Sequence, residues 1–236
     1  GTGIISNRYG GWVIPSFSGT PCRFTGLYKG IDAYATGSLQ SGLFVTQNLF
    51  QEVNKGITLN GNAVSRISYN HFLRLDKNSY AVYALQTRGI AIHHNYISVS
   101  VPPSAYYEKP YGIALYNSGI GGALVVNNTF VSDDPTQTNF QRFRAATQVE
   151  GNNNPNVLID CNNFVALSDY DIRIFNSPDF EDQGGCDEFN SDLNPTANNW
   201  HNPALAPAGT QHIYYDNAIE TINVTCLPGY EPTLVS

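Results

Sequence analysis

The chain has 236 residues, of which 42% are hydrophobic and only 13% are charged, and it contains 15 Tyr and 12 Phe. This composition favours strands and turns over solvated helices, and the length suits a single all-β domain. The formal net charge is −7, and the 12 Lys and Arg are scattered, which argues against a nucleic-acid partner. No apolar run approaches the roughly 20 residues needed to cross a bilayer. Because Met is absent, even as an initiator, we expect a processed chain or a fragment of a larger protein.

The chain repeats one motif: an aliphatic residue, two variable residues, Asn, one variable residue, then Phe or Ile. Five copies have identical internal spacing: Val45–Asn48–Phe50, Ile67–Asn70–Phe72, Ile92–Asn95–Ile97, Val125–Asn128–Phe130 and Ile159–Asn162–Phe164. A degenerate sixth copy is Asn198–Trp200, and Cys22–Phe24 has Cys in the Asn position. Such regular recurrence is typical of a repeat architecture.

A short alternating segment follows each copy of the motif. Its aliphatic pairs are Ile31 and Ala33, Ile57 and Leu59, Val82 and Ala84, Ile113 and Leu115, Ile172 and Ile174, and more weakly Ile213 and Tyr215. The copy expected near Thr147 is poorly formed. Alternation with period two predicts strands whose aliphatic pairs face inward. Each repeat therefore supplies at least three short strands and one fixed corner.

Asn suits that corner because its amide tolerates the left-handed backbone conformation and can bond neighbouring peptide groups. Stacked coils would align the amides into a structural Asn ladder, which comprises Asn48, Asn70, Asn95, Asn128 and Asn162. The steps between these residues and on to Asn198 are 22, 25, 33, 34 and 36 residues, so a loop elsewhere in the repeat absorbs the differences in length. The fold prediction is an all-β solenoid with Asn-marked turns and variable loop insertions. An antiparallel sandwich or barrel is the alternative.

The same pattern leaves room for one helical segment outside the coils, and it divides the chain into two regions. Residues Thr136 to Gln148 are the best helix candidate, because Phe140, Phe143 and Thr147 would share a helical face. We expect residues 1–200 to form the coils. Residues 201–236 would form the last coil, a carboxyl-terminal closure and an extended exit, within a single domain overall.

At the repeat, from about Phe24 to Trp200, the chain resembles right-handed parallel β-helix repeat proteins. Its Asn-rich, Tyr-rich and weakly charged sequence looks like secreted or cell-surface proteins of Bacteroidota. The resemblance implies an extracellular or cell-surface bacterial location, with further domains or a secretion complex as neighbours. The family includes polysaccharide lyases and hydrolases, phage tailspikes, adhesins and non-catalytic passengers, so the fold alone does not fix the function.

An enzyme acting on polysaccharide is one functional hypothesis. The outward ladder between the inward pairs has little charge: Asp32, Thr58, Tyr83, Ala114 and Arg173. Asp32 and Arg173 would lie five coils apart, about 24 Å at about 4.8 Å per coil. A hydrolase needs two carboxylates about 5 to 10 Å apart, and this ladder offers none. Loops could supply a pair in Asp133 and Asp134 or in Asp169 and Asp171, although such pairs are more often solvated turn residues.

The second hypothesis, which we favour, is a non-catalytic surface module: an adhesin-like binding platform or a rigid passenger. Tyr34, Tyr83, Tyr116 and Phe175 would form an outward aromatic stripe for stacking on a glycan or packing against another surface protein. The alternative is that the insert Ser98 to Tyr111 folds over the stripe and makes it ordinary core. We assign no catalytic residue and expect no required cofactor.

Two further clusters have weaker interpretations. Asp179, Asp182 and Asp187 lie in an acidic loop that could hold Ca²⁺ or could simply be solvated. His93 and His94 are adjacent on a strand, so without a bend they point to opposite faces and do not share a metal.

The chain has four cysteines. Cys22 and Cys161 are about five coils apart and cannot pair with each other. We expect a Cys186–Cys226 disulfide that clamps the last coil, with four reduced thiols as the alternative.

Overall fold

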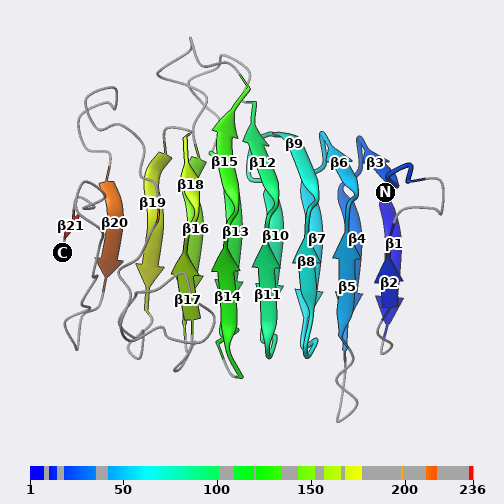
Figure 1. The fold of residues 1–236 in the computed structure, drawn as a ribbon, viewed down its shortest axis with the longest axis horizontal. Helices are drawn as coiled ribbons and strands as arrows, with labels where there is room; N and C mark the ends of the chain where they lie inside the picture. The colour runs from blue at the N-terminus through cyan, green and yellow to red at the C-terminus, as the bar shows by residue number, and fades with distance from the viewer. Residues whose placement is uncertain are drawn as a thin grey trace.

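The computed structural model describes residues 1–7, 11–14, 19–35, 42–100, 109–119, 121–133, 143–151, 157–165, 168–176, 198, 211–216 and 234–235. Every regular element in this part of the chain is a β-strand (Figure 1). The strands form three sheets, which we call A, B and C, and neighbouring strands pair in parallel in all three. The chain is therefore all-β and parallel, and the antiparallel alternative is wrong.

Sheet A has nine strands and sheets B and C have six each. Sheet A contains, in spatial order, β1 (Thr2–Asn7), β4 (Lys29–Tyr34), β7 (Lys55–Asn60), β10 (Tyr80–Leu85), β13 (Tyr111–Tyr116), β16 (Phe143–Glu150), β19 (Ser168–Phe175), β20 (Gln211–Asp216) and β21 (Leu234–Val235). Sheet B contains β2 (Gly11–Val13), β5 (Leu43–Thr46), β8 (Arg66–Ser68), β11 (Ile90–His93), β14 (Ala123–Val126) and β17 (Val157–Asp160). Sheet C contains β3 (Arg23–Thr25), β6 (Leu49–Gln51), β9 (His71–Leu75), β12 (Tyr96–Val99), β15 (Thr129–Ser132) and β18 (Asn163–Phe164).

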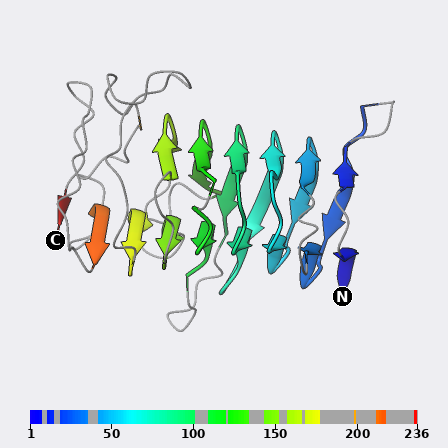
Figure 2. The same cartoon turned by 90° about the horizontal axis from the view of Figure 1, so that it is seen from below.

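Successive strands enter sheets A, B and C in turn from β1 to β18, and the same order is visible in a view turned by 90° (Figure 2). Each passage through the three sheets thus places a new strand beside the strand three elements earlier. This path is compatible with a parallel β-helix. Beyond β18, the described strands β19, β20 and β21 all belong to sheet A.

The core is built from columns of equivalent side chains on successive coils. One column runs along sheet C through Phe24, Phe50, Phe72, Ile97, Phe130 and Phe164, which pair in register. The rings of Phe50 and Phe72 stack with centroids 4.8 Å apart, and all six side chains are buried. Stacking identical apolar side chains removes them from water without voids, which is the main stabilising term of such a core.

Small residues in sheet A make room for these rings. A Cβ added to Gly56 would lie 2.6 Å from a ring carbon of Phe72 and 2.5 Å from the carbonyl oxygen of Ala81. Gly112 is equally close to Phe130. Both glycines are buried beside an aliphatic residue that is also buried, so the strict alternation of faces fails at the start of these strands.

The five repeated asparagines are buried and hydrogen-bonded to one another between coils. Asn95 is representative: its Nδ2 donates to the oxygens of Ile67, His93 and Asn128 at 2.9, 3.1 and 3.0 Å. Its Oδ1 accepts from the backbone N of Asn70 at 3.0 Å. These bonds satisfy buried peptide groups at the turn between sheets B and C.

The left-handed residue at this turn is not the asparagine. Positive φ belongs to the residue before it: Gln47, Tyr69, His94, Asn127 and Cys161, with φ between 53° and 58°. The expectation that Asn was chosen for its backbone tolerance is wrong for these five positions. Asn is needed there for its amide: the side-chain nitrogens donate to buried oxygens, and the side-chain oxygens of Asn70, Asn95, Asn128 and Asn162 accept from the coil before.

The helix predicted from Thr136 to Gln148 is also wrong where it can be compared. Residues Phe143–Glu150 form strand β16, paired with β13 on one side and β19 on the other. Phe143, Thr147 and Val149 are buried in the strand. The apolar positions fitted a helical spacing as well as period two, and pairing with two neighbouring strands decides between them.

Candidate functional site

The outer face of sheet A carries two adjacent rows of side chains, set by the strand register. The first row is Asp32, Thr58, Tyr83, Ala114, Gln148 and Arg173. The second row is Tyr34, Asn60, Leu85, Tyr116, Glu150 and Phe175. Asp32 and Arg173 are five strands apart in the sheet, about 24 Å, as the sequence predicts.

Four tyrosines on β10 and β13 form one cluster, which we call the tyrosine cluster: Tyr80, Tyr83, Tyr111 and Tyr116. The rings of Tyr80 and Tyr111 stack at 5.1 Å with an interplanar angle of 7°. Tyr80 meets Tyr83 edge-on at 5.3 Å, and Tyr83 lies 5.1 Å from Tyr116. All four side chains are half-buried. The cluster is thus neither covered core nor a set of isolated surface rings.

A polar group borders the cluster on β16 and β19. Gln148 Nε2 donates to the hydroxyl oxygen of Tyr116 at 2.9 Å and to Glu150 Oε2 at 3.0 Å. Arg173 Nη1 donates to Gln148 Oε1 at 3.0 Å. The Arg173 guanidinium also lies over the rings of Phe175 and Tyr170, at 4.9 and 5.8 Å. Gln148 therefore fixes the position of Tyr116 and Arg173 together.

Lys55, on β7, borders the cluster on its other side. Its Nζ lies 5.3 Å from the ring centre of Tyr83 and 5.9 Å from that of Tyr80. A cation over an aromatic face is attracted by the ring quadrupole. The tyrosine cluster is therefore flanked by a cation on each side, Lys55 and Arg173.

The tyrosine hydroxyls are held in their protonated form. Burial raises the pKa of Tyr80 to about 12, with a further contribution from Tyr111. Burial also raises the pKa values of Tyr116 and Tyr83, and the Glu150 carboxylate adds to the rise in both. Because the phenolate forms are disfavoured, these hydroxyls serve as neutral hydrogen-bonding groups and not as bases.

The structure unites part of the predicted aromatic stripe. Tyr83 and Tyr116 are in contact. Phe175 joins them indirectly, through Arg173 and Gln148. Tyr34 lies apart on β4, because Asn60 and Leu85 occupy the two coils between it and Tyr116.

Sequence reasoning missed Tyr80, Tyr111, Gln148 and Glu150. Period-two alternation places Tyr80 on the same side as Val82, whereas Ala81 and Val82 are both buried and Tyr80 is half-buried in contact with Tyr83. Gln148 and Glu150 were hidden by the helical interpretation of their segment. Extending the aligned strand pattern through Thr147 would have found both.

Asp32 and Glu150, on the outer face of sheet A, lie too far apart to form a catalytic pair. Asp32 accepts from Lys29 Nζ at 2.7 Å, and Glu150 is four strands away, about 19 Å. Asp169 is bound by Lys109 Nζ at 2.6 Å, and the buried Asp171 accepts from the hydroxyl of Ser168. Asp169 and Asp171, which the sequence analysis placed in a loop, thus lie in strand β19 and are engaged with neighbouring side chains.

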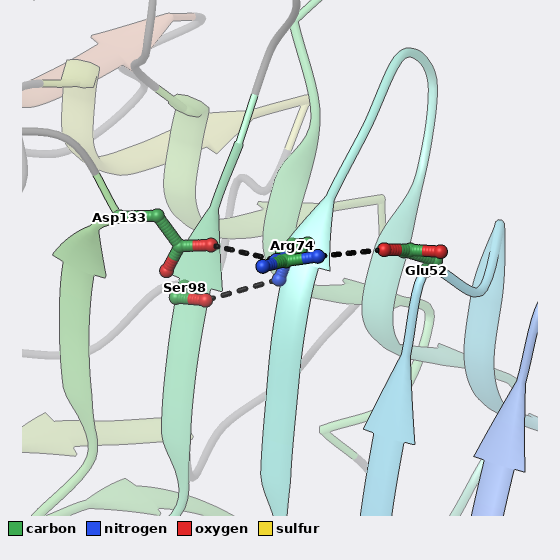
Figure 3. Close-up of polar contacts among 4 residues, drawn as sticks. All are labelled: Glu52, Arg74, Ser98 and Asp133. Carbon is green, nitrogen blue, oxygen red and sulfur yellow. Dashed lines mark hydrogen bonds and ion pairs between the residues drawn. The ribbon is translucent and has the colours of Figure 1, made fainter.

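Asp133 belongs to an ion network at the end of sheet C (Figure 3). Arg74 lies between Glu52, at 3.0 Å, and Asp133, at 4.0 Å, and its backbone N donates to Ser98 Oγ at 3.0 Å. Arg74 and Glu52 are exposed, so each ion pair contributes at most about 1 kcal/mol. The network links four successive coils. Asp134, the other member of the predicted pair, lies outside the described residues.

His93 and His94 contact each other, contrary to the expectation of opposite faces. His93 ends β11, and His94 has a φ of 55°, so the backbone bend brings their Nδ1 atoms to 2.9 Å. Arg66 Nε donates to His93 Nε2 at 2.7 Å. Burial, with smaller contributions from Arg66 and His94, lowers the pKa of His93 to about 4. His93 is therefore neutral at physiological pH.

The predicted metal ligands lie outside the described residues, whereas two of the four cysteines, Cys22 and Cys161, lie within them. No group of three or more His, Cys, Asp or Glu that could hold a metal occurs among the described residues, and Asp179, Asp182 and Asp187 lie outside them. Cys22 is a free thiol, whereas Cys161 is disulfide-bonded.

Cys186 and Cys226, which form the expected disulfide, both lie outside the described residues.

Comparison of the chain with protein-family models, curated proteins and solved structures found no match. In the described part of the chain, no helix is long and apolar enough to cross a membrane. The described residues define an all-β chain with three parallel sheets. Its main candidate functional groups lie on the outer face of sheet A.

Proposed function

We propose that the chain is a parallel β-helix module of an extracellular or cell-surface bacterial protein, and that it binds glycan without chemical change. The tyrosine cluster with its bordering Gln148 carries the proposal. The rings supply apolar faces and the bordering polar groups supply directional contacts. Saccharides need this combination, because their rings have apolar CH faces and polar edges.

Preorganisation supports binding at this face. The four rings touch one another, and Tyr116 is held by Gln148 at 2.9 Å. Half-buried rings on adjacent strands lose little side-chain freedom when a ligand stacks on them. A rigid platform reduces the entropic cost of association. The same rigidity would suit a protein partner, which is the other ligand class for an adhesin-like surface.

Binding explains the described groups better than catalysis does. Glycoside hydrolysis uses two carboxylates about 5 to 10 Å apart, whereas Asp32 and Glu150 are about 19 Å apart. The raised pKa values of the tyrosines remove them as bases at neutral pH. A polysaccharide lyase or hydrolase remains the alternative function, with its chemistry supplied by loops.

The cysteine chemistry supports the proposed location. A disulfide at Cys161 is typical of proteins in oxidising compartments, such as the periplasm or the cell exterior. The family resemblance points to the same location.

Retention on immobilised glycans tests the proposal. The wild-type chain is compared with a Tyr83→Ala, Tyr116→Ala double variant on a panel of neutral and acidic polysaccharides. We expect at least one glycan to retain the wild type and to lose the variant. Tyr28→Ala is the matched control, because Tyr28 is 57% exposed and lies outside the tyrosine cluster.

Three outcomes would contradict the proposal. One is unchanged retention of the double variant, and another is no retention of the wild type on any glycan. The third is release of reducing or unsaturated sugars, with or without Ca²⁺, which would establish the enzymatic alternative. Because the rings are half-buried, we expect the double variant to lose no more than about 2 kcal/mol of stability. A much larger loss would show that the tyrosines are core.

A further inference from the structure

A second exposed aromatic surface lies at the turn between sheets B and C, away from sheet A. On two adjacent coils the ladder asparagine is flanked in opposite order: Tyr69-Asn70-His71 on one coil and His94-Asn95-Tyr96 on the next. This exchange places Tyr beside His on both sides of the Asn ladder. Tyr69 stacks on His94 at 4.9 Å, and His71 stacks on Tyr96 at 5.5 Å.

These four side chains are exposed, and two of them belong to residues with an unfavourable backbone conformation. Tyr69 and Tyr96 are 49% and 38% exposed, and both histidines are exposed as well. Tyr69 and His94 have φ values of 56° and 55°, a conformation that bulky residues rarely adopt. The next coil has Asn127 at this position with the same φ of 55°. The positive φ belongs to every copy of this turn, but of the five residues at this position only Tyr69 and His94 are aromatic, which suggests a use other than stability for these two side chains.

A hydrogen-bond relay sets the proton positions in this surface. The Arg66 guanidinium only donates, so His93 Nε2 accepts its bond at 2.7 Å and the proton of His93 lies on Nδ1. That Nδ1–H donates to His94 Nδ1 at 2.9 Å. Because His94 Nδ1 accepts this bond, the His94 ring has its proton on Nε2 and presents it as a donor.

The charge of this surface is opposite to that of the chain as a whole. Arg66, His71 and His94 form no ion pair with a described residue, in contrast to Lys29, Arg74 and Lys109. The net charge of the whole chain is −7. A donor-rich aromatic surface without a carboxylate partner fits an anionic ligand that also has ring faces.

We propose that Arg66, Tyr69, His71, His94 and Tyr96, which we call the corner patch, bind a polyanionic glycan carrying sulfate or carboxylate groups. The two Tyr–His stacks supply the ring contacts, and Arg66 and His94 supply the donors. This site is independent of the tyrosine cluster, because it lies on different sheets and different strands.

Binding to immobilised dextran sulfate, with neutral dextran as the reference, tests this second site. The variants take residues that the chain itself uses at the equivalent positions of the next coil, Asn127 and Thr129. One variant combines Tyr69→Asn with His94→Asn, and another combines His71→Thr with Tyr96→Thr. Arg66→Gln removes the charge and keeps a donor for His93. Arg88→Gln is the control, since Arg88 is also exposed and lies at the other end of β11.

We expect the wild type to bind dextran sulfate and not dextran, with an affinity that falls as salt is raised. Each corner variant should weaken binding by about tenfold or more, the equivalent of one lost charge-assisted contact. Arg88→Gln and the Tyr83→Ala, Tyr116→Ala variant should bind dextran sulfate like the wild type. Equal binding by the corner variants, or no binding by the wild type, would overturn the proposal. Circular dichroism spectra matching the wild type would exclude misfolding as the cause of a loss.

Discussion

Replacing Asn95 with Asp changes one amide nitrogen to oxygen and tests whether the amide ladder supports the fold. Asn95 is 2% exposed, and its Nδ2 is shared among the oxygens of Ile67, His93 and Asn128. An ionised Asp would place an oxygen against these three acceptors. The acceptance from Asn70 through Oδ1 would be retained.

The oxygens of His93 and Asn128 keep other donors, the backbone N of Tyr69 and of Asn95, whereas the Ile67 carbonyl loses the amide donor. A buried acceptor that loses its hydrogen bond costs about 1 to 3 kcal/mol, and this is the loss expected for Asn95→Asp. Repulsion between the carboxylate and these oxygens raises the pKa of the new Asp. Once protonated, the new side chain regains one donor. The loss should therefore be largest at neutral pH and smaller in acid.

Guanidinium unfolding followed by circular dichroism, at pH 7 and at pH 4.5, measures both effects. Asn127→Asp is the matched control: Asn127 is exposed on the next coil, and its substitution should change stability by less than about 0.5 kcal/mol. A loss below about 1 kcal/mol for Asn95→Asp, or an equal loss in the control, would refute the reasoning. The ladder amides would then be incidental to stability.

Three further perturbations test the core, the histidine relay and the disulfide. Gly56→Ala should destabilise the protein by about 1 to 3 kcal/mol in thermal unfolding, because its Cβ would meet the Ala81 carbonyl oxygen at 2.5 Å. His93 is neutral in the folded state with a pKa of about 4 against 6.5 when unfolded, so its contribution to stability is lost as pH falls from about 6.5 to 4. Replacing His93 with Val should reduce the free energy of unfolding that is lost between pH 6.5 and pH 4, by at most about 3 kcal/mol. A non-reducing digest should contain Cys161 in a linked peptide pair and Cys22 as an alkylatable thiol.

Each of these three predictions has a control or a result that would contradict it. Gly11→Ala, where the new Cβ would only touch Leu43 at 3.9 Å, should leave stability nearly unchanged. An acid profile of His93→Val that matches the wild type would show that His93 is not buried as a neutral group. An alkylatable Cys161 thiol in the unreduced digest would contradict the disulfide at Cys161.

The sequence predicted the positions that follow the repeat spacing. It did not predict which face a side chain lies on where the inward–outward alternation of the strand breaks. The fixed spacing of Phe50 and Phe72 from their asparagines implies equivalent positions on successive coils, and the two rings do stack in one column. Tyr80 was missed because Ala81 and Val82 are both buried, which breaks alternation, and alternation is the only guide in the sequence to the face on which a strand residue lies. The sequence puts His93 and His94 on opposite faces unless the strand bends, and the positive φ of His94 that brings them into contact cannot be read from its residue type.

Long-range pairing accounts for the other differences. Gln148 and Glu150 belong to the outer face only because β16 pairs with both β13 and β19, and local residue spacing around Phe143 fits a helix equally well. The charge of the outer face was underestimated as a result. The disulfide at Cys161 likewise depends on a contact between distant segments.

A crystal structure of the chain with an oligosaccharide from a retained glycan tests the central claim most directly, because it locates the ligand. The account predicts sugar rings stacked on Tyr83 and Tyr116, with polar contacts to the groups that border them on β16 and β19. A ligand bound only elsewhere on the molecule, with the tyrosine cluster unoccupied, would contradict it.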